Sequence, residues 1–325
     1  MTVLSSSNDL LLLSWGGGFS ISLASSFQAA GMSVRHCALR TVEKQNPLLD
    51  NLVFAEDALS TSRTIVWWPS FAQGTLPGQT LDAEALANKQ FESEQWNALS
   101  WLYDESESHF PLGRPANLMK WSSRAPAIWL ARKLGIGIPR YCLALNGVDA
   151  SEFISRIHSS GSKVMMKRLS DNRFFIDGRV SIPVIVETED FANSGPLDAP
   201  IWLEEIVEPS NEARVFVVGD NVRVFDIQDV GGNALDARLQ GDRKFVRGQI
   251  SSENSKNLEE LTRAMKLRYC CFDILLKQNE MIVIDVNPLG TTDGFPVKFT
   301  KEVQSLIANE VLSWVSMPLD EKRAL

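Results

Sequence analysis

The sequence predicts an α/β protein built from three subdomains, and three observations lead to that prediction. The chain has 325 residues, more than one hydrophobic core usually supports. Its hydrophobic fraction of 44% and charged fraction of 22% are those of an ordinary globular protein. Short apolar runs alternate with a helical pattern near the N-terminus and are joined by tight turns later on. We expect subdomains over residues 1–118, 119–200 and 201–325.

The first subdomain alternates strands and helices. Its expected elements are strands over Leu10–Ser14, Ser33–Cys37 and Thr64–Trp68 and helices over Ile21–Ala30 and Glu92–Tyr103. Three glycines, Gly16 to Gly18, turn the chain after the first strand. Their position suggests a dinucleotide-binding loop, but Ile21 stands where the next glycine would be needed. We therefore set an NAD site aside.

The rest of the chain predicts helices separated by strands and hairpins. Arg124–Leu134 is an amphipathic helix that ends at Gly135, and Ala192–Pro200 has the composition of a loop. Further strands are expected over Lys163–Lys167, Phe174–Ile176, Val184–Val186, Ile201–Val207, Arg214–Gly219, Val222–Ile227, Cys271–Leu276 and Met281–Val286, and further helices over Leu258–Leu267 and Val303–Val315.

Composition excludes several classes of protein. The net charge of -8 argues against nucleic-acid and anionic-membrane binding. The four cysteines have no metal-binding spacing, which leaves no basis for a zinc site or a disulfide framework. The apolar run Leu10–Leu13 lacks a basic region before it, and no run is long enough to span a membrane. We expect a cytoplasmic protein.

Three oxygen-bearing side chains near the C-terminus predict a metal site. Asp285 and Asn287 are two residues apart on a predicted strand, so they face the same side. Asp273 lies on the preceding strand, and a hairpin would bring it alongside them. Such ligands suit Mg²⁺ held between protein and phosphates. Taken alone, an Asp-x-Asn-Pro motif reads more simply as the solvent-facing end of a strand.

Cations and acids follow in a fixed order before that motif. Lys167 ends an apolar strand, Glu204 to Val207 follow a loop, and Glu212 and Arg214 open the next strand. Asp236 to Arg238 close a later segment. Each alone could be a surface charge at the end of a strand. Together they are the mixture that a nucleotide needs, with cations for its phosphates and an acid for its ribose.

At this point the sequence resembles the ATP-grasp superfamily, and within it most closely the ligases that make microviridin-type (graspetide) crosslinks in peptides. The ribosomal-protein glutamate ligases are the next most similar group. The resemblance covers roughly residues 60–295. Its pieces are Arg124–Pro139, Val164–Lys167, Glu204–Val207, Glu212–Arg214, Asp236–Arg238, Phe272-Asp273 and Asp285–Gly290, with looser matches at Thr64–Pro69 and Glu92–Leu99.

The resemblance assigns roles to single residues. It implies that Lys167 contacts ATP phosphate and adenine, and that the backbone of Glu205 and Ile206 meets the adenine edge. Glu212 would bind the ribose. The remaining assignments are the active-site arginine Arg238, the basic residue Arg214 near the acyl-phosphate, and the metal ligands Asp273, Asp285 and Asn287.

Two positions depart from the family pattern. Arg124 stands where the family usually has a nucleotide-contacting lysine, which keeps the charge but replaces a point donor by a planar fork. Asp285 stands where the family usually has glutamate, so a bidentate metal contact could become monodentate. Both departures leave room for altered activity.

The resemblance implies an ADP-forming ligase with an N-terminal pre-ATP-grasp domain, a central and a C-terminal subdomain. ATP and two Mg²⁺ ions, with Mn²⁺ as the alternative, would support acyl-phosphate formation. The expected product is an ester or amide crosslink in a ribosomally synthesised precursor peptide. An amino-acid or small-molecule ligase and a catalytically silent nucleotide-binding scaffold are the alternatives. Neither nucleic acid nor membrane is expected as a partner, and a homodimer is left open.

Tryptophans are the last signal. Five of them gather in the N-terminal third, at Trp67, Trp68, Trp96, Trp101 and Trp121. Core packing is the simpler interpretation, and a docking surface for a peptide is the alternative.

Overall fold

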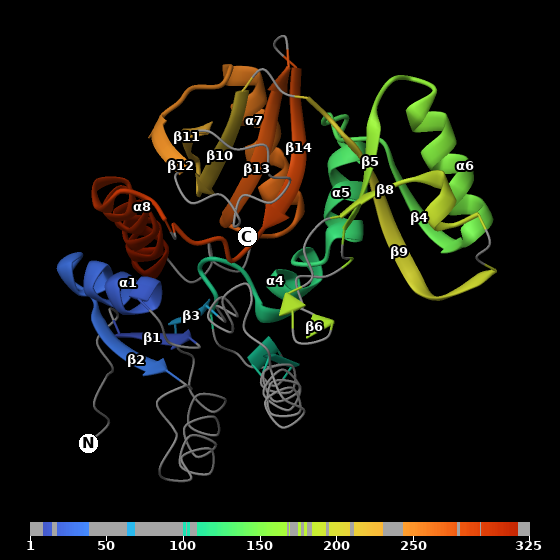
Figure 1. The fold of residues 1–325 in the computed structure, drawn as a ribbon. Helices are drawn as coiled ribbons and strands as arrows, with labels where there is room; N and C mark the ends of the chain where they lie inside the picture. Colours follow the sequence, from blue (N-terminus) through green and yellow to red (C-terminus); the bar gives the residue numbers. More distant parts are fainter. Residues whose placement is uncertain are drawn as a thin grey trace.

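The computed structural model describes residues 9–14, 18–38, 64–68, 100–101, 103–104, 109–167, 169, 175–176, 179–180, 184–192, 195–208, 211–229, 243–277, 280–292 and 294–317. Its strands form an N-terminal, a central and a C-terminal sheet (Figure 1), together with one two-stranded hairpin. Within these residues no helix is long and apolar enough to cross a membrane.

The N-terminal sheet is parallel and has the strand order β2-β1-β3. Its elements are β1 (Asp9–Ser14), α1 (Gly18–Ala29), β2 (Ser33–Ala38) and β3 (Thr64–Trp68). Leu10 and Leu12 of β1 pack into one core and Leu11 and Leu13 into another. Burial on both faces explains why this strand reads as a continuous apolar run.

Two helices lead from this sheet to the central one. They are α4 (Pro115–Trp121) and α5 (Arg124–Lys133). α5 ends as predicted at Gly135, whose φ of 75° lies in the left-handed region that glycine adopts readily. The chain then runs along the edge of the C-terminal sheet, where the amide of Val283 donates to the carbonyl of Gly137 over 2.8 Å.

The central sheet is antiparallel, with the strand order β4-β9-β5-β8. Its strands are β4 (Tyr141–Asn146), β5 (Lys163–Lys167), β8 (Val184–Val186) and β9 (Pro196–Ile206), and α6 (Gly147–His158) covers one face. The hairpin β6 (Phe175–Ile176) and β7 (Arg179–Val180) and the short helix η2 (Thr188–Asp190) lie between β5 and β9 in the chain. The Asn146 side chain accepts a hydrogen bond from the backbone amide of Asp149 and so caps the N-terminus of α6.

The C-terminal sheet is antiparallel, with the strand order β12-β11-β10-β13-β14. Its elements are β10 (Asn211–Val218), β11 (Asn221–Asp229), β12 (Arg243–Arg247), α7 (Ser252–Ala264), β13 (Tyr269–Lys277), β14 (Glu280–Asn287) and α8 (Val297–Ser316). α7 packs against one face and α8 against the other. α8 also lies beside α1, so the two ends of the described chain pack together (Figure 1).

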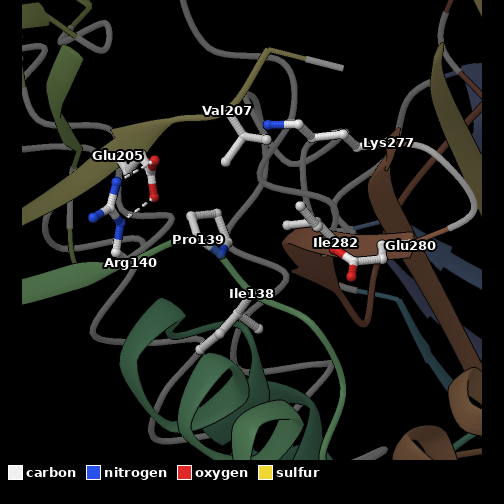
Figure 2. A pocket seen from close by; sticks show the side chains of 8 residues that line it. All are labelled: Ile138, Pro139, Arg140, Glu205, Val207, Lys277, Glu280 and Ile282. Atoms are coloured by element: carbon white, nitrogen blue, oxygen red, sulfur yellow. Dashed lines mark hydrogen bonds and ion pairs between the residues drawn. The ribbon is translucent and has the colours of Figure 1, made fainter. Parts of the chain in front are cut away.

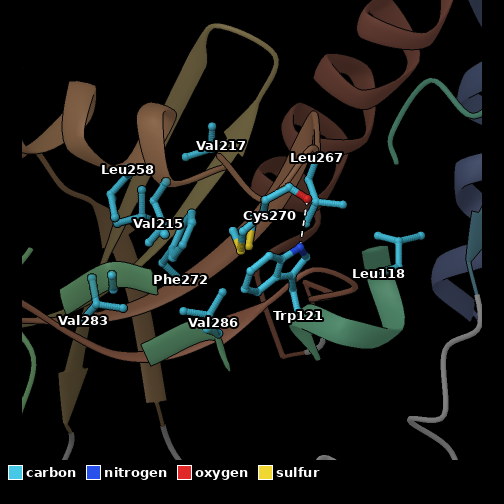
Figure 3. Packing of buried hydrophobic residues seen from close by; sticks show 14 of the residues in the cluster. Leu118, Trp121, Val215, Val217, Leu258, Leu267, Cys270, Phe272, Val283 and Val286 are labelled. Atoms are coloured by element: carbon cyan, nitrogen blue, oxygen red, sulfur yellow. Dashed lines mark hydrogen bonds between the residues drawn. The ribbon is translucent and has the colours of Figure 1, made fainter. Parts of the chain in front are cut away.

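The described residues form three hydrophobic cores. Two of them join the N-terminal and C-terminal sheets, and Figure 3 shows one, in which Trp121 of α4 packs near Cys270 and Phe272. The indole of Trp121 donates to the carbonyl of Met265 over 2.9 Å, which satisfies a polar group that would be costly to bury alone. The third core lies between α6 and the central sheet and has no member in common with the other two. The expected division at 118/119 and 200/201 stays a proposal, and β9 crosses the second boundary.

The structure corrects several expectations about single elements. The segment Ala192–Pro200 is not all loop, because β9 begins at Pro196 and pairs there with Asn146. Proline is tolerated at the first residue of a strand.

Two helices begin earlier than expected. α7 begins at Ser252 rather than Leu258, because Ser251 caps a polar first turn that lacks an apolar stripe. α8 begins at Val297 rather than Val303. The elements α4, α6 and β12 were not anticipated, and most of the expected helix Glu92–Tyr103 lies outside the described residues.

Candidate active site

The central sheet holds a lysine against a buried carboxylate. Lys167 of β5 lies opposite Trp202 of β9, and Glu204, two residues further along β9, shares that face. The Lys167 ammonium donates to Glu204 Oε1 over 2.5 Å, and the Trp202 indole donates to Glu204 Oε2 over 3.0 Å. The Glu204 side chain is only 3% exposed, so these donors supply the compensation that a buried carboxylate requires.

A row of charged side chains crosses the C-terminal sheet. Asp285 lies opposite Asp273, and Asp273 lies opposite Arg214. The Arg214 guanidinium donates twice to Asp273, over 2.7 and 3.0 Å. The Asp273 charge raises the pKa of Arg214 well above its usual value, and this effect outweighs burial, which lowers it. Arg214 therefore stays charged, in the fork geometry that matches a carboxylate or phosphate.

Arg124 joins the two sheets. It is the first residue of α5, and its Nη2 lies 3.0 Å from Asp285 Oδ1. Its Nη1 donates to the carbonyl of Ile284 over 2.8 Å and lies 3.8 Å from Glu204 Oε2. One guanidinium thus bridges the carboxylates of both sheets. The lysine that the family usually has here could not make all these contacts from one fixed plane.

The two aspartates fit the requirements of a hard divalent cation. Like charges directly opposite each other on neighbouring strands repel, and Asp273 and Asp285 are such a pair. Their side chains are 22% and 35% exposed, so both carboxylates remain within reach of a ligand. Within the described ranges no group of three or more His, Cys, Asp or Glu could hold a metal. The two carboxylates would supply part of a coordination shell, as protein ligands do in Mg²⁺ sites shared with phosphates.

Asn287 follows Asp285 on the same face and lies opposite Cys271. Its side-chain oxygen accepts the amide of Leu289 over 3.0 Å, so it caps the turn that leaves β14. An amide oxygen has two lone pairs. One of them is used in the turn, and the other would serve a ligand.

The predicted adenine hinge lies at the end of β9 and borders a pocket (Figure 2). The pocket is lined by Ile138, Pro139, Arg140, Glu205, Val207, Lys277, Glu280 and Ile282. The amide of Glu205 donates to the carbonyl of Arg140 over 2.9 Å, and its carboxylate accepts both arms of the Arg140 guanidinium over 2.7 Å each. This hydrogen bonding lowers the pKa of the Glu205 carboxyl. An adenine edge would have to use other backbone groups of the segment.

Two predicted residues remain. Glu212, two residues before Arg214, lies on the same face of the C-terminal sheet and is partly buried opposite Leu275. Arg238 lies outside the described residues. The structure therefore connects five predicted residues with Glu204: Arg124, Lys167, Arg214, Asp273 and Asp285. Glu212 and Asn287 lie on the same face of the C-terminal sheet. Glu205 lines the pocket, and Ile206 stands between the lining residues Glu205 and Val207 in the chain.

Sequence reasoning missed the part played by Glu204 and Trp202. It passed over Glu204 and assigned a role to its neighbour Glu205. A usable signal was present: Trp202 and Glu204 alternate on a strand, and a buried carboxylate needs cationic partners such as Lys167.

Comparisons with known proteins identify the family of this chain. Residues 122–315 match the RimK-like ATP-grasp domain family. A probable alpha-L-glutamate ligase from Shewanella loihica is 28% identical over 188 residues, which are 55% of this chain and 58% of that relative. The chain thus spans a little more than half the length of the curated relative that it matches.

Two solved structures show how far the fold is shared. The macrocyclase MdnC from Microcystis aeruginosa, bound with the precursor peptide MdnA, has a TM-score of 0.69 at 17% identity and covers 94% of this chain and 99% of its own. A RiPP-associated ATP-grasp ligase from Chryseobacterium gregarium, in complex with ADP and a leader and core peptide, has a TM-score of 0.70 at 19% identity, with 96% and 98% covered. Identities this low establish the fold alone. That fold is the predicted one, and the predicted resemblance is confirmed.

Proposed function

This chain belongs to the RimK-like ATP-grasp family, and from that premise we propose that it is an ATP-dependent ligase that activates a carboxylate as an acyl-phosphate and joins it to a hydroxyl or an amine. In the first step a carboxylate oxygen attacks the γ-phosphorus of ATP, and the bond to the bridging oxygen breaks to release ADP. In the second step the hydroxyl or amine attacks the acyl carbon, phosphate leaves, and the nucleophile loses its proton.

The observation that carries the proposal is the bridge made by Arg124. It brings the Lys167–Glu204 pair of one sheet to the Arg214, Asp273 and Asp285 row of the other. Cations on both sides of one site are what a triphosphate needs, and two partly exposed carboxylates give a divalent cation a place beside it. Structural salt bridges on two independent sheets would have no need to converge.

Each residue then has a role toward the charge that builds up during transfer. Lys167, fixed by Glu204, would donate to a phosphate oxygen, and Arg214, fixed by Asp273, would hold the carboxylate that reacts and its acyl-phosphate. Arg238 would add a second arginine on the phosphate side. Bound Mg²⁺, held by Asp273, Asp285 and Asn287, would neutralise the terminal phosphates. Glu212 would bind the ribose, and the backbone around Glu205 and Ile206 would bind the adenine.

For the substrate we propose a ribosomally synthesised peptide that receives ester or amide crosslinks. The support is that the two solved structures of the same fold contain peptides, a precursor in one and a leader and core peptide in the other. The tryptophans add little support, because Trp67, Trp68 and Trp121 are buried in the cores. Trp101 and Trp129 are exposed. A second candidate, an amino-acid or small-molecule ligase, is favoured by the name of the Shewanella relative.

The test separates the nucleotide chemistry from the choice of acceptor. Nucleotide products separated by chromatography should be ADP and phosphate, and AMP as the main product would contradict the acyl-phosphate route. Mass spectrometry of a candidate precursor co-expressed with the protein should show a loss of about 18 Da per crosslink, because each condensation within one chain removes one water after acyl-phosphate formation. A gain of whole amino-acid masses would instead favour the amino-acid ligase.

A further inference from the structure

We propose that Arg247 and Arg223 form a second carboxylate-binding site, which holds an acidic side chain of a peptide substrate about two or four residues away from the carboxylate that reacts. The inference rests on the proposed function, because it takes Arg214 as the residue that holds the reacting carboxylate.

The row of side chains at the candidate active site continues to the far edge of the C-terminal sheet. Arg214 of β10 lies opposite Phe225 of β11, and Phe225 lies opposite Arg247 of β12. Arg247 therefore shares a face with Arg214 and Asp273. Neighbouring strands lie about 4.8 Å apart, so the two arginines start from backbone positions about 10 Å apart.

Arg247 and Arg223 already hold one carboxylate, that of Glu302 from α8. Arg223 Nε donates to Glu302 Oε1 over 2.9 Å, and Arg247 Nη2 donates to Glu302 Oε2. Among the described residues, two guanidinium groups against one carboxylate leave one positive charge in excess. The exposed Lys298 and Lys301 lie within one turn of Glu302 and add to it. This surplus lies on a protein whose net charge is -8, and it suits an acidic ligand.

Aromatic rings hold the Arg247 guanidinium in place. Its Cζ lies 5.1 Å from the centre of the Phe225 ring and 5.7 Å from that of Phe299. The side chain is nevertheless 46% exposed. Stacking on rings limits the rotamer freedom that binding would otherwise remove, and a fixed guanidinium fork is suited to a carboxylate. Arg247 is thus both oriented and accessible.

The separation of the two sites sets the separation of the two acids. An extended peptide rises about 3.3 Å per residue and its side chains alternate between two faces. Two acids that reach Arg214 and Arg247 from the same side of such a peptide, over a backbone distance of about 10 Å, are therefore about two or four residues apart. A substrate with an acid at that offset from the reacting residue would engage both arginines. A substrate with one acid would engage only the first.

The test uses the full chain with Mg²⁺ and ADP and fluorescein-labelled peptides of Gly, Ser and Thr that carry two glutamates at every separation up to about six residues. Fluorescence anisotropy at low ionic strength should give a higher affinity at separations of about two and four, which place both glutamates on one side of an extended peptide, than at about three. Arg247→Gln should weaken that affinity about tenfold, the size of one charge-assisted hydrogen bond. Arg247→Lys should cost less, since it keeps the charge and loses the fork. Glu302→Gln should strengthen binding about threefold, because it removes the competing carboxylate.

The matched control is Lys244→Gln. Lys244 is exposed on the same strand as Arg247, but its side chain points to the other face of the sheet. It should leave the affinity unchanged, and peptides with one glutamate should not respond to Arg247→Gln. Equal losses from Lys244→Gln and Arg247→Gln would overturn the proposal. A folded Glu302→Gln variant with no gain in affinity would also overturn it, because that is the result expected if Arg223 and Arg247 only anchor α8.

Calorimetry with ADP separates the two proposals. Failure of wild-type protein to bind ADP counts against the proposed function, whereas normal ADP binding with no preferred separation counts against this site alone.

Discussion

The two sheets that meet at Arg124 hold their carboxylates in opposite ways. Glu204 of the central sheet is buried and receives hydrogen bonds from Lys167 and Trp202. Asp285 of the C-terminal sheet is about a third exposed and contacts Arg124 at its open edge. A buried, fully paired carboxylate fixes its neighbours, whereas a partly exposed one can exchange its partner for a ligand. From this difference we expect Glu204 to position Lys167 and Asp285 to contact the ligand itself.

The largest effect on activity is expected from removal of the partly exposed carboxylate of Asp285. Asp285→Ala should abolish turnover, with a loss of more than about a thousandfold, because the substrate phosphates would lose their divalent cation. Steady-state release of phosphate measures this effect. Asp220→Ala removes the charge of an acid that is 81% exposed at the β10–β11 turn and is the matched control. A folded Asp285→Ala variant with the wild-type rate would show that the metal assignment is wrong.

The next effect concerns the cations that face the phosphates. Lys167→Met and Arg238→Ala should each lower the rate by about 10²–10³, the usual cost of one donor to a developing charge. Lys163→Met is the control, since Lys163 is exposed at the other end of β5. Single-turnover kinetics distinguish a loss in chemistry from a loss in binding. Losses below about threefold in both variants would argue against the nucleotide site as a whole.

Removing the charge of the buried carboxylate, Glu204, should have a smaller effect on the rate and a larger effect on stability. Glu204→Gln should leave Lys167 poorly positioned and lower turnover by about tenfold to a hundredfold. It should also lower the free energy of unfolding by about 2–3 kcal/mol, because a buried charged pair is broken. Thermal melts and turnover, compared with Glu208→Gln at an exposed site near the end of β9, measure both. If Glu204→Gln left the free energy of unfolding unchanged, the proposed difference between a positioning carboxylate and a ligand-binding one would be wrong.

The smallest effect is a dependence on pH at the border of the pocket. Hydrogen bonding to Arg140 lowers the pKa of Glu205 below its usual value of 4.5. The pair therefore adds stability above about pH 4.5, and this stability is lost as the pH falls through the lowered pKa. Arg140 is about half exposed, so solvent limits the contribution to about 1 kcal/mol or less.

Arg140→Gln should therefore make the fall in melting temperature below about pH 4.5 shallower than in the wild-type protein. The measurement is a series of thermal melts in buffers of equal ionic strength. Identical slopes in the two proteins would mean that Glu205 gains nothing from Arg140.

The sequence predicted the parts of this molecule that repeat a local pattern. Asp273 and Asp285 could be placed side by side because a short turn between two apolar runs dictates a hairpin, and β13 and β14 pair them. Lys167 could be placed at the end of a strand for the same reason. β1 and β3 of the N-terminal sheet were found because burial on both faces leaves an uninterrupted apolar run.

What the sequence could not give is contact between elements far apart in the chain. Arg124 precedes Asp285 by many residues, and only the packing of α5 against β14 brings them together. The predicted hinge uses the backbone of Glu205 and Ile206 and gives no role to Glu204. The Glu204 side chain faces Lys167, because side chains alternate along β9 and the register with β5 decides which one points inward. α6 was missed since its capping residue Asn146 ends a strand and gives no separate signal.

The independent core beneath α6 bears on how the protein fluctuates. Since this core has no member in common with the other two, the central sheet is a candidate cooperative opening unit that can lose its packing while the rest stays folded. Such an opening would break the contact of Arg124 with Glu204, whereas its contact with Asp285 would stay, because α5 packs against β14 in another core. Amide protons of β4, β5 and α6 should exchange with solvent as one group, faster than those of β10 and β13, and a ligand that spans both sheets should slow that group most.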